Sequence, residues 1–176
     1  MNFARALEPL AAFLEDLDAR WAVIGGVALA AYGHLRTTLD LDLVLEAKIQ
    51  QRLVAFLESR GYRTLHCSSG YSNHLHDDPL LGRLDFVFVD PETAEKLFAA
   101  TRWLKGPHER PIPVAAPEHL VAMKVMALKN DPSRSELERA DLRFLLRQPG
   151  VDLDYARSLF ARHGLEATYD ELREAT

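Results

Sequence analysis

The most constraining stretch of this sequence is a run of alternating leucine and aspartate. Residues 39–45 read LDLDLVL. Successive side chains of a β-strand point to opposite faces, so the alternation predicts a strand whose leucines, Leu39 included, face the core. Asp40 and Asp42 then lie side by side on the other face. Alternation with acidic residues is also typical of a strand with one solvated face, so the pair alone does not define a site.

A glycine pair lies upstream of this strand. The apolar residues Trp21–Ile24 predict a short buried strand, Gly25 and Gly26 end it, and the next residues favour a helix. A strand that leads through glycines into a helix N-terminus presents backbone N–H groups and a positive dipole end to an anion. Glycine also lets a phosphate approach the backbone closely. The alternative for Gly-Gly alone is an ordinary tight turn.

A third carboxylate follows on a later strand. Residues 83–89 read RLDFVFV, so the large apolar side chains share one face and Asp85 takes the other with Arg83. If this strand pairs with the Asp40–Asp42 strand, three carboxylates converge. Two charges about 4 Å apart repel by roughly 4 kcal/mol at an effective dielectric constant of 20. A divalent cation of the magnesium type reverses that repulsion, because it prefers oxygen ligands.

The combined pattern resembles the DNA polymerase β-like nucleotidyltransferase superfamily. The matching residues are Gly25-Gly26, then Arg36-x-Thr38-x-Asp40-x-Asp42, then a strand with Asp85. The similarity is strongest to small bacterial members: toxin nucleotidyltransferases of abortive-infection (AbiEii-type) and toxin–antitoxin systems, and lincosamide and aminoglycoside nucleotidyltransferases. It covers residues 21–90 well and the rest of the chain loosely.

The resemblance implies a role for each matching residue. Gly25 and Gly26 would hold the β- and γ-phosphates of a nucleoside triphosphate (NTP). Asp40 and Asp42 would bind two Mg²⁺ ions when the NTP is bound, and Asp85 would bind the catalytic ion and help activate the acceptor hydroxyl. Arg36 and Thr38 would either contact phosphate or anchor the loop before the strand. Gly26 stands where many relatives have a serine.

The implied activity is transfer of a nucleoside monophosphate from an NTP to a hydroxyl, with release of pyrophosphate. The acceptor would be tRNA, a protein or a small molecule such as an antibiotic. The toxin-like function, with a cognate antitoxin as partner, leads slightly over the antibiotic-modifying one, whose members often carry tryptophan where this chain has Val27. A member of the fold without catalytic activity, which binds a nucleotide or a partner protein, is the alternative from another class.

Two charged residues interrupt apolar stripes in the C-terminal region. Lys124 lies among Leu120, Val121 and Val125 at helical spacing, and Asp141 has a similar position on the next helix. A charge in such a position needs a partner or an open cleft. We expect either a buried structural ion pair or a lysine that reaches the triphosphate, as in the toxin-like relatives; Lys129 is the alternative lysine.

The chain as a whole predicts an α/β (α+β) fold. A mixed sheet flanked by helices would form a nucleotidyltransferase core over residues 1–115, and residues 116–176 would form a helical region that folds with it. Trp103 is expected in the core. No apolar stretch is long enough for a membrane span, and the single cysteine, Cys67, fits a reducing cytoplasm.

Overall fold

The computed structural model describes residues 1–130 and 135–174 of the 176-residue chain. The chain divides into two compact units, Met1–Ala115 and Ala116–Thr176. That the two fold together as a single unit stays a prediction.

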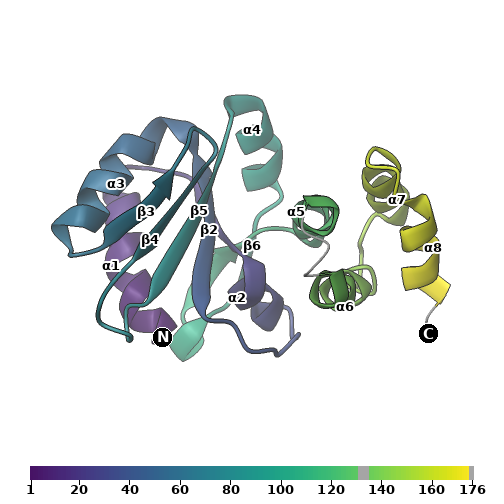
Figure 1. Cartoon of the computed structure of the whole chain (residues 1–176), viewed down its shortest axis with the longest axis horizontal. Coiled ribbons are helices and arrows are strands. Elements are labelled where there is room, and N and C mark those ends of the chain that lie inside the picture. The colour runs from purple at the N-terminus through teal and green to yellow at the C-terminus, as the bar shows by residue number, and fades with distance from the viewer. Residues whose placement is uncertain (131–134, 175–176) are drawn as a thin grey trace. The chain divides into compact units, whose positions relative to one another are not determined.

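A mixed seven-stranded sheet forms the centre of the first unit (Figure 1). Its strands are β1 (Trp21–Ile24), β2 (Asp40–Glu46), β3 (Arg63–Cys67), β4 (Tyr71–Leu75), β5 (Arg83–Val89), β6 (Arg102–Lys105) and β7 (Pro111–Val114). Their order is β3-β4-β5-β2-β1-β7-β6, which places β2 between β5 and β1 in the middle of the sheet. β2 runs parallel to β5 and antiparallel to β1. The predicted mixed α/β fold is confirmed.

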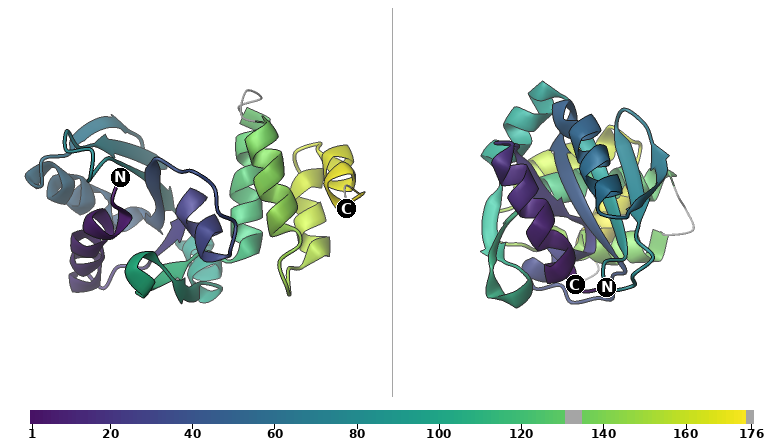
Figure 2. Two further views of the ribbon diagram at one scale, coloured as in Figure 1. Left: turned by 90° about the horizontal axis from the view of Figure 1, so that it is seen from below. Right: turned by 90° about the vertical axis from the view of Figure 1, so that its left-hand side faces the viewer.

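Helices cover both sides of this sheet. Those of the first unit are α1 (Phe3–Asp16), α2 (Gly25–Ala31), α3 (Gln50–Ser59) and α4 (Pro91–Ala99), with short 3₁₀ turns at Ala47–Ile49 and Pro107–Glu109. Figures 1 and 2 show α1 and α3 on one side and α2 and α4 on the other. Leu41, Leu43 and Leu45 are fully buried, as their alternation predicts. Asp40 and Asp42 lie on the opposite face of β2 from these leucines, and this is the face toward α2, because the Asp42 side chain lies against Gly25 at the start of that helix.

Two apolar residues do not lie where the sequence places them. Leu39 is 78% exposed, because β2 begins one residue later, at Asp40, and leaves Leu39 in the preceding loop. Trp103 is 68% exposed rather than buried. It lies on β6, which forms one edge of the sheet and pairs with β7. Local alternation and residue type do not report where a strand starts or which strand forms an edge.

The second unit is helical, as predicted. Its described helices are α5 (Pro117–Asn130), α6 (Ser135–Leu145), α7 (Leu153–Ala161) and α8 (Glu166–Glu174). α5 packs against both α6 and α7, and α7 packs against α8. The rings of Phe160 and Tyr169 meet edge to face at 5.3 Å across the last pair. None of the described helices combines the length and apolarity that a bilayer crossing requires.

Candidate functional site

The glycine pair forms a turn that other side chains closely surround. β1 ends at Ile24 and α2 begins directly at Gly25, whose φ of +63° favours glycine. A Cβ atom on Gly25 would lie 2.0 Å from Oδ2 of Asp42, and one on Gly26 would lie 2.6 Å from Oγ1 of Thr38. Both positions therefore require glycine, because a larger residue would collide with the side chains that line the site.

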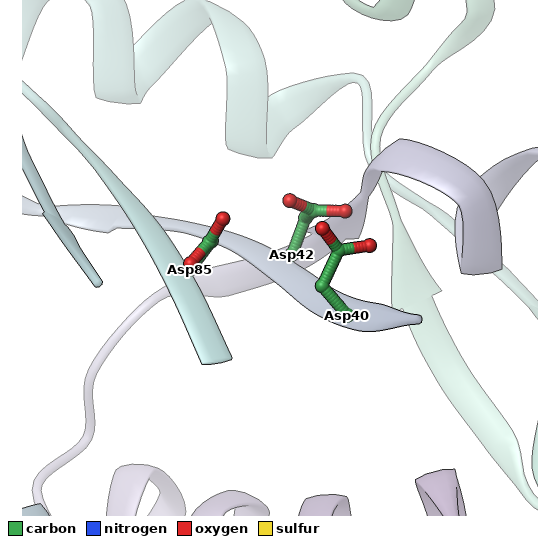
Figure 3. A group of neighbouring side chains, drawn as sticks. All are labelled: Asp40, Asp42 and Asp85. Atoms are coloured by element: carbon green, nitrogen blue, oxygen red, sulfur yellow. The ribbon is translucent and has the colours of Figure 1, made fainter. Parts of the chain in front are cut away.

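Strand register brings the three predicted carboxylates together. β2 and β5 pair in parallel with Asp42 opposite Asp85, and Asp40 lies two residues earlier on the same face of β2. Figure 3 shows the three side chains extending to the same side of the two strands. One carboxylate oxygen from each lies within 4.8 Å of the others. We call Asp40, Asp42 and Asp85 the carboxylate trio.

Neighbouring side chains donate hydrogen bonds to Asp40 and to Asp85. The hydroxyl of Thr38 donates a hydrogen bond to Oδ1 of Asp40 at 2.9 Å. Nε of Arg83 donates to Oδ1 of Asp85 at 2.8 Å, and the Asp85 side chain is only 11% exposed. The hydrogen bond from Arg83 to Asp85 raises the pKa of Arg83 above its usual value, so the guanidinium stays charged.

A polar network continues from Arg83 to β4. Nη2 of Arg83 donates to the hydroxyl oxygen of Tyr71 at 3.5 Å, and Nδ2 of Asn73 donates to the same oxygen at 3.4 Å. Asn73 lies directly opposite Asp85 in the β4–β5 register. Burial, together with the charge of Asp85, raises the pKa of Tyr71, so its phenol is neutral near pH 7. This strand pair thus supplies hydrogen-bonding groups beside the third carboxylate.

The carboxylate trio has the chemistry of a divalent-cation site. It offers three oxygen ligands of the kind that Mg²⁺ prefers, within a common small volume. Gly25 leaves the space beside Asp42 that a side chain would otherwise fill. The residues present therefore fit a divalent metal, which would offset the repulsion between the carboxylates.

The other predicted contacts of the first unit lie beside this site. Thr38 packs against Gly26 and bonds to Asp40, so it connects the glycine turn with the carboxylate trio. Nη1 of Arg36 donates to the carbonyl oxygen of Thr37 at 3.2 Å. These contacts are consistent with the role of Arg36 and Thr38 as anchors of the loop before β2. A contact of either residue with phosphate stays a prediction.

Lys124 and Asp141 meet in the second unit. Nζ of Lys124 lies 2.7 Å from Oδ2 of Asp141 and 2.8 Å from Oε2 of Glu138. The side chains of Asp141 and Glu138 are 0% and 1% exposed, and that of Lys124 is 11% exposed. The two residues form a buried ion pair, one of the two expected outcomes. A role in triphosphate binding stays a prediction.

Three residues of these two networks were given no functional role from the sequence. Glu138 completes the group around Lys124, and its i, i+3 spacing from Asp141 on α6 was the available signal. Arg83 shares a strand face with Asp85, but the pattern does not show that it bonds to this carboxylate. Tyr71 had no local signal, because its position depends on the pairing of β4 with β5.

No family model and no curated protein matches this sequence. Solved structures do. The solution structure of the antibiotic-resistance factor ANT(2'')-Ia is 16% identical, with a TM-score of 0.71 over 99% of this chain and 97% of that one. A crystal structure of ANT(2'')-Ia in complex with adenylyl-2''-tobramycin has a TM-score of 0.62 at 16% identity, over 93% and 92% of the two chains.

A second antibiotic-modifying protein is also similar. The lincosamide antibiotic adenylyltransferase LnuA, solved with lincomycin bound, is 16% identical, with a TM-score of 0.54 over 81% of this chain and 96% of that one. At these identities the similarity establishes a shared fold. The sequence resemblance is strongest over residues 21–90, whereas the structural similarity extends over nearly the whole length of each neighbour.

Proposed function

We propose that this chain is a Mg²⁺-dependent nucleotidyltransferase that moves a nucleoside monophosphate from an NTP to a hydroxyl group. One observation carries the proposal: Asp40, Asp42 and Asp85 converge within 4.8 Å beside a glycine turn. Clustered carboxylates destabilise a fold unless a cation joins them, so a module that only bound a partner would gain nothing from the cluster. The fold is shared with a lincosamide antibiotic adenylyltransferase and with a protein solved in complex with adenylyl-2''-tobramycin, which supports the same activity.

Each part of the site would have a defined role. Asp40 and Asp42 would hold both Mg²⁺ ions, and Asp85 would hold one of them. Backbone N–H groups of Gly25 and Gly26 would contact the β- and γ-phosphates, where the two glycines leave room for close approach. Ions held by these carboxylates would supply positive charge that offsets the negative charge of the triphosphate.

The reaction is a displacement at the α-phosphorus. The acceptor oxygen forms a bond to the α-phosphorus while the bond from that phosphorus to the α–β bridging oxygen breaks. Asp85 takes the proton of the acceptor hydroxyl, and pyrophosphate leaves with the electron pair of the broken bond. The contribution of the protein is positioning and charge neutralisation rather than covalent chemistry.

For the acceptor, we propose a hydroxyl-bearing small molecule first and tRNA or a protein second. The match over 97% of the ANT(2'')-Ia chain supports a small-molecule acceptor, since that fold carries an adenylylated antibiotic in the tobramycin complex. The toxin-like alternative, with a cognate antitoxin as partner, draws its support from the sequence resemblance. We place the activity in the cytoplasm, where NTPs and Mg²⁺ are available and Cys67 stays reduced.

Lys124 and Asp141 enter this proposal with a condition. A lysine that contacts the triphosphate must exchange at least one of its two carboxylate partners for phosphate. Nζ of Lys124 lies 2.7 Å from Asp141 and 2.8 Å from Glu138. The exchange is therefore unfavourable by itself, because it leaves a buried carboxylate without its ammonium. Lys124 would therefore serve the nucleotide only if phosphate charge replaces that of the carboxylates.

The test is label transfer. The full chain is incubated with each α-labelled NTP, Mg²⁺ and, in separate reactions, tobramycin, lincomycin, total tRNA and the protein alone. Transfer that disappears in Asp42→Asn supports the enzyme and identifies the acceptor class. If no acceptor is labelled, and calorimetry shows no Mg²⁺-dependent NTP binding, the chain is a member of the fold without catalytic activity.

A further inference from the structure

Arg83 places a positive charge directly on the carboxylate trio. It lies two residues before Asp85 on the same face of β5, and in the sheet register it is opposite Asp40. Its Nε donates to Oδ1 of Asp85 at 2.8 Å. The Asp85 side chain is 11% exposed and that of Arg83 is 42% exposed, so the carboxylate is largely removed from solvent whereas the guanidinium is partly in contact with it.

The guanidinium is braced in this position. Its Nη2 donates to the hydroxyl oxygen of Tyr71 at 3.5 Å, and Asn73 donates to the same oxygen at 3.4 Å from the neighbouring position on β4. A cross-strand bond on one side and a carboxylate on the other limit the rotation of the long side chain. Arg83 therefore holds its positive charge beside Asp85 through the 2.8 Å hydrogen bond, although 42% of its side chain is exposed.

A fixed cation beside a metal ligand has two opposite effects. It offsets part of the repulsion within the carboxylate trio when no ion is bound, and it repels a divalent ion that uses Asp85 as a ligand. We propose that Arg83 is the intrinsic counter-ion of the third carboxylate. In this role it keeps the divalent-ion affinity at Asp85 low until a triphosphate adds its own negative charge.

This inference rests on the proposed function, because it assumes that Asp85 is a metal ligand. Its consequence is an order of loading. The ion held through Asp85 joins the site together with the triphosphate rather than before it, since the phosphate charge outweighs the repulsion from Arg83. An enzyme built this way does not hold its full set of ions in the absence of nucleotide.

The test measures Mn²⁺ binding, with Mn²⁺ as a spectroscopically visible substitute for Mg²⁺, by electron paramagnetic resonance. In the absence of nucleotide, Arg83→Gln is expected to bind Mn²⁺ on the order of 10-fold more tightly than the wild type, the scale on which outer partners of metal ligands change affinity. Arg83→Lys, which keeps the charge, should stay near the wild type. A non-hydrolysable triphosphate should reduce the difference between Arg83→Gln and wild type.

Two controls separate this role from a structural one. Arg63, on β3, also pairs with a carboxylate, that of Asp77, at 3.1 Å. Arg63→Gln should leave the Mn²⁺ affinity unchanged. In an Asp85→Asn background, Arg83→Gln should lose its effect. Arg83→Ala, which removes the same charge, must repeat the gain seen with Gln.

The proposal is overturned if Arg83→Gln and Arg83→Ala bind Mn²⁺ as weakly as the wild type or more weakly, because a purely supporting residue would produce that result. It is also overturned if the gain persists without the Asp85 carboxylate. Failure of the proposed function has a different signature. In that case the Mn²⁺ affinities follow the charge at residue 83, and no acceptor is labelled in the transfer assay.

Discussion

Two groups of carboxylates in this chain meet the same electrostatic problem in different ways. The carboxylate trio of the first unit has partly open oxygens and a guanidinium bonded to one member, Asp85. In the second unit, Glu138 and Asp141 are almost fully buried, and the ammonium of Lys124 lies within 2.8 Å of both. We call these three residues the lysine cluster. The carboxylate trio can accept an added cation besides Arg83, whereas Glu138 and Asp141 share the buried ammonium of Lys124.

A ligand site and a structural ion group should therefore respond differently to the loss of one charge. Buried charges that carry their own counter-ion are costly to break, since removal of one partner leaves an uncompensated charge. A cluster that depends on an external cation should instead tolerate neutralisation in the absence of that cation and lose its function.

Asp42→Asn should reduce nucleotidyl transfer by about 10³-fold or more, since it removes several kcal/mol of metal-based stabilisation of the transition state. Its metal-free melting temperature should not fall, because Asn keeps the size of Asp and a hydrogen-bonding oxygen while one of three mutually repelling charges is removed. Asp77→Asn is the matched control, as Asp77 is an exposed aspartate of the same unit. Transfer rates and thermal melts of both variants provide the measurement, and equal rates would remove Asp42 from the site.

Lys124→Met should lower the free energy of unfolding by about 3–5 kcal/mol, because Glu138 and Asp141 would be left buried without their ammonium. Lys129→Met, at the exposed end of α5, should change it by less than about 0.5 kcal/mol. Urea denaturation followed by circular dichroism measures both. A small loss for Lys124→Met, combined with weaker NTP binding, would instead favour Lys124 as a triphosphate ligand.

Mg²⁺ should stabilise the wild type and not Asp42→Asn. At about tenfold over its dissociation constant, a ligand adds roughly 1.4 kcal/mol, which corresponds to about 3 to 6 °C for a chain of this size. Lys124→Met should keep a Mg²⁺-dependent shift in the first unit. Differential scanning fluorimetry with Mg²⁺, against matched NaCl, is the measurement, and an equal shift in Asp42→Asn would place the ion elsewhere.

The smallest effect concerns pH and the opposite face of β4. His74 is fully buried between the hydroxyls of Thr64 and Ser72, at 3.1 and 2.9 Å, and burial lowers the pKa of its imidazole. The unfolded chain takes up this proton near the ordinary pKa of about 6.5, whereas the folded chain resists it. Stability should therefore fall as the pH drops below about 6.5 and level off below the folded-state pKa.

His74→Gln replaces the imidazole with an amide that does not titrate and can still form hydrogen bonds to the two hydroxyls, so it should flatten this pH dependence. Urea midpoints at a series of pH values in wild type and variant test it. If the slope survives in His74→Gln, the acid sensitivity belongs to carboxylates, and the pH behaviour of the two clusters must be measured separately.

Much of the site was predictable because it depends on local alternation. In a strand, Asp40 and Asp42 must share a face, and Asp85 must lie opposite the large apolar residues of β5. A glycine pair between a buried strand and a helix marks a close approach. These patterns do not require knowledge of the whole fold, so residues 21–90 indicated both the architecture and the carboxylates.

The partners of those residues were not predictable. Whether Arg83 turns toward Asp85, Asp40 or solvent depends on Tyr71, which reaches it only because β4 pairs with β5. Glu138 joins Lys124 only through the packing of α6 on α5. Trp103 is exposed because β6 forms an edge of the sheet, a property of strand order that its own residues do not encode.

By itself, then, the sequence determined which residues share a strand face and where the chain must turn without a side chain. Period-two alternation and the absence of a Cβ are properties of each residue and its immediate neighbours. The tertiary structure alone decided which strand lies beside β2, which cation reaches each carboxylate and which apolar residues stay in water. Those outcomes depend on contacts between residues distant in the chain, and such contacts form only when the sheet and helices assemble.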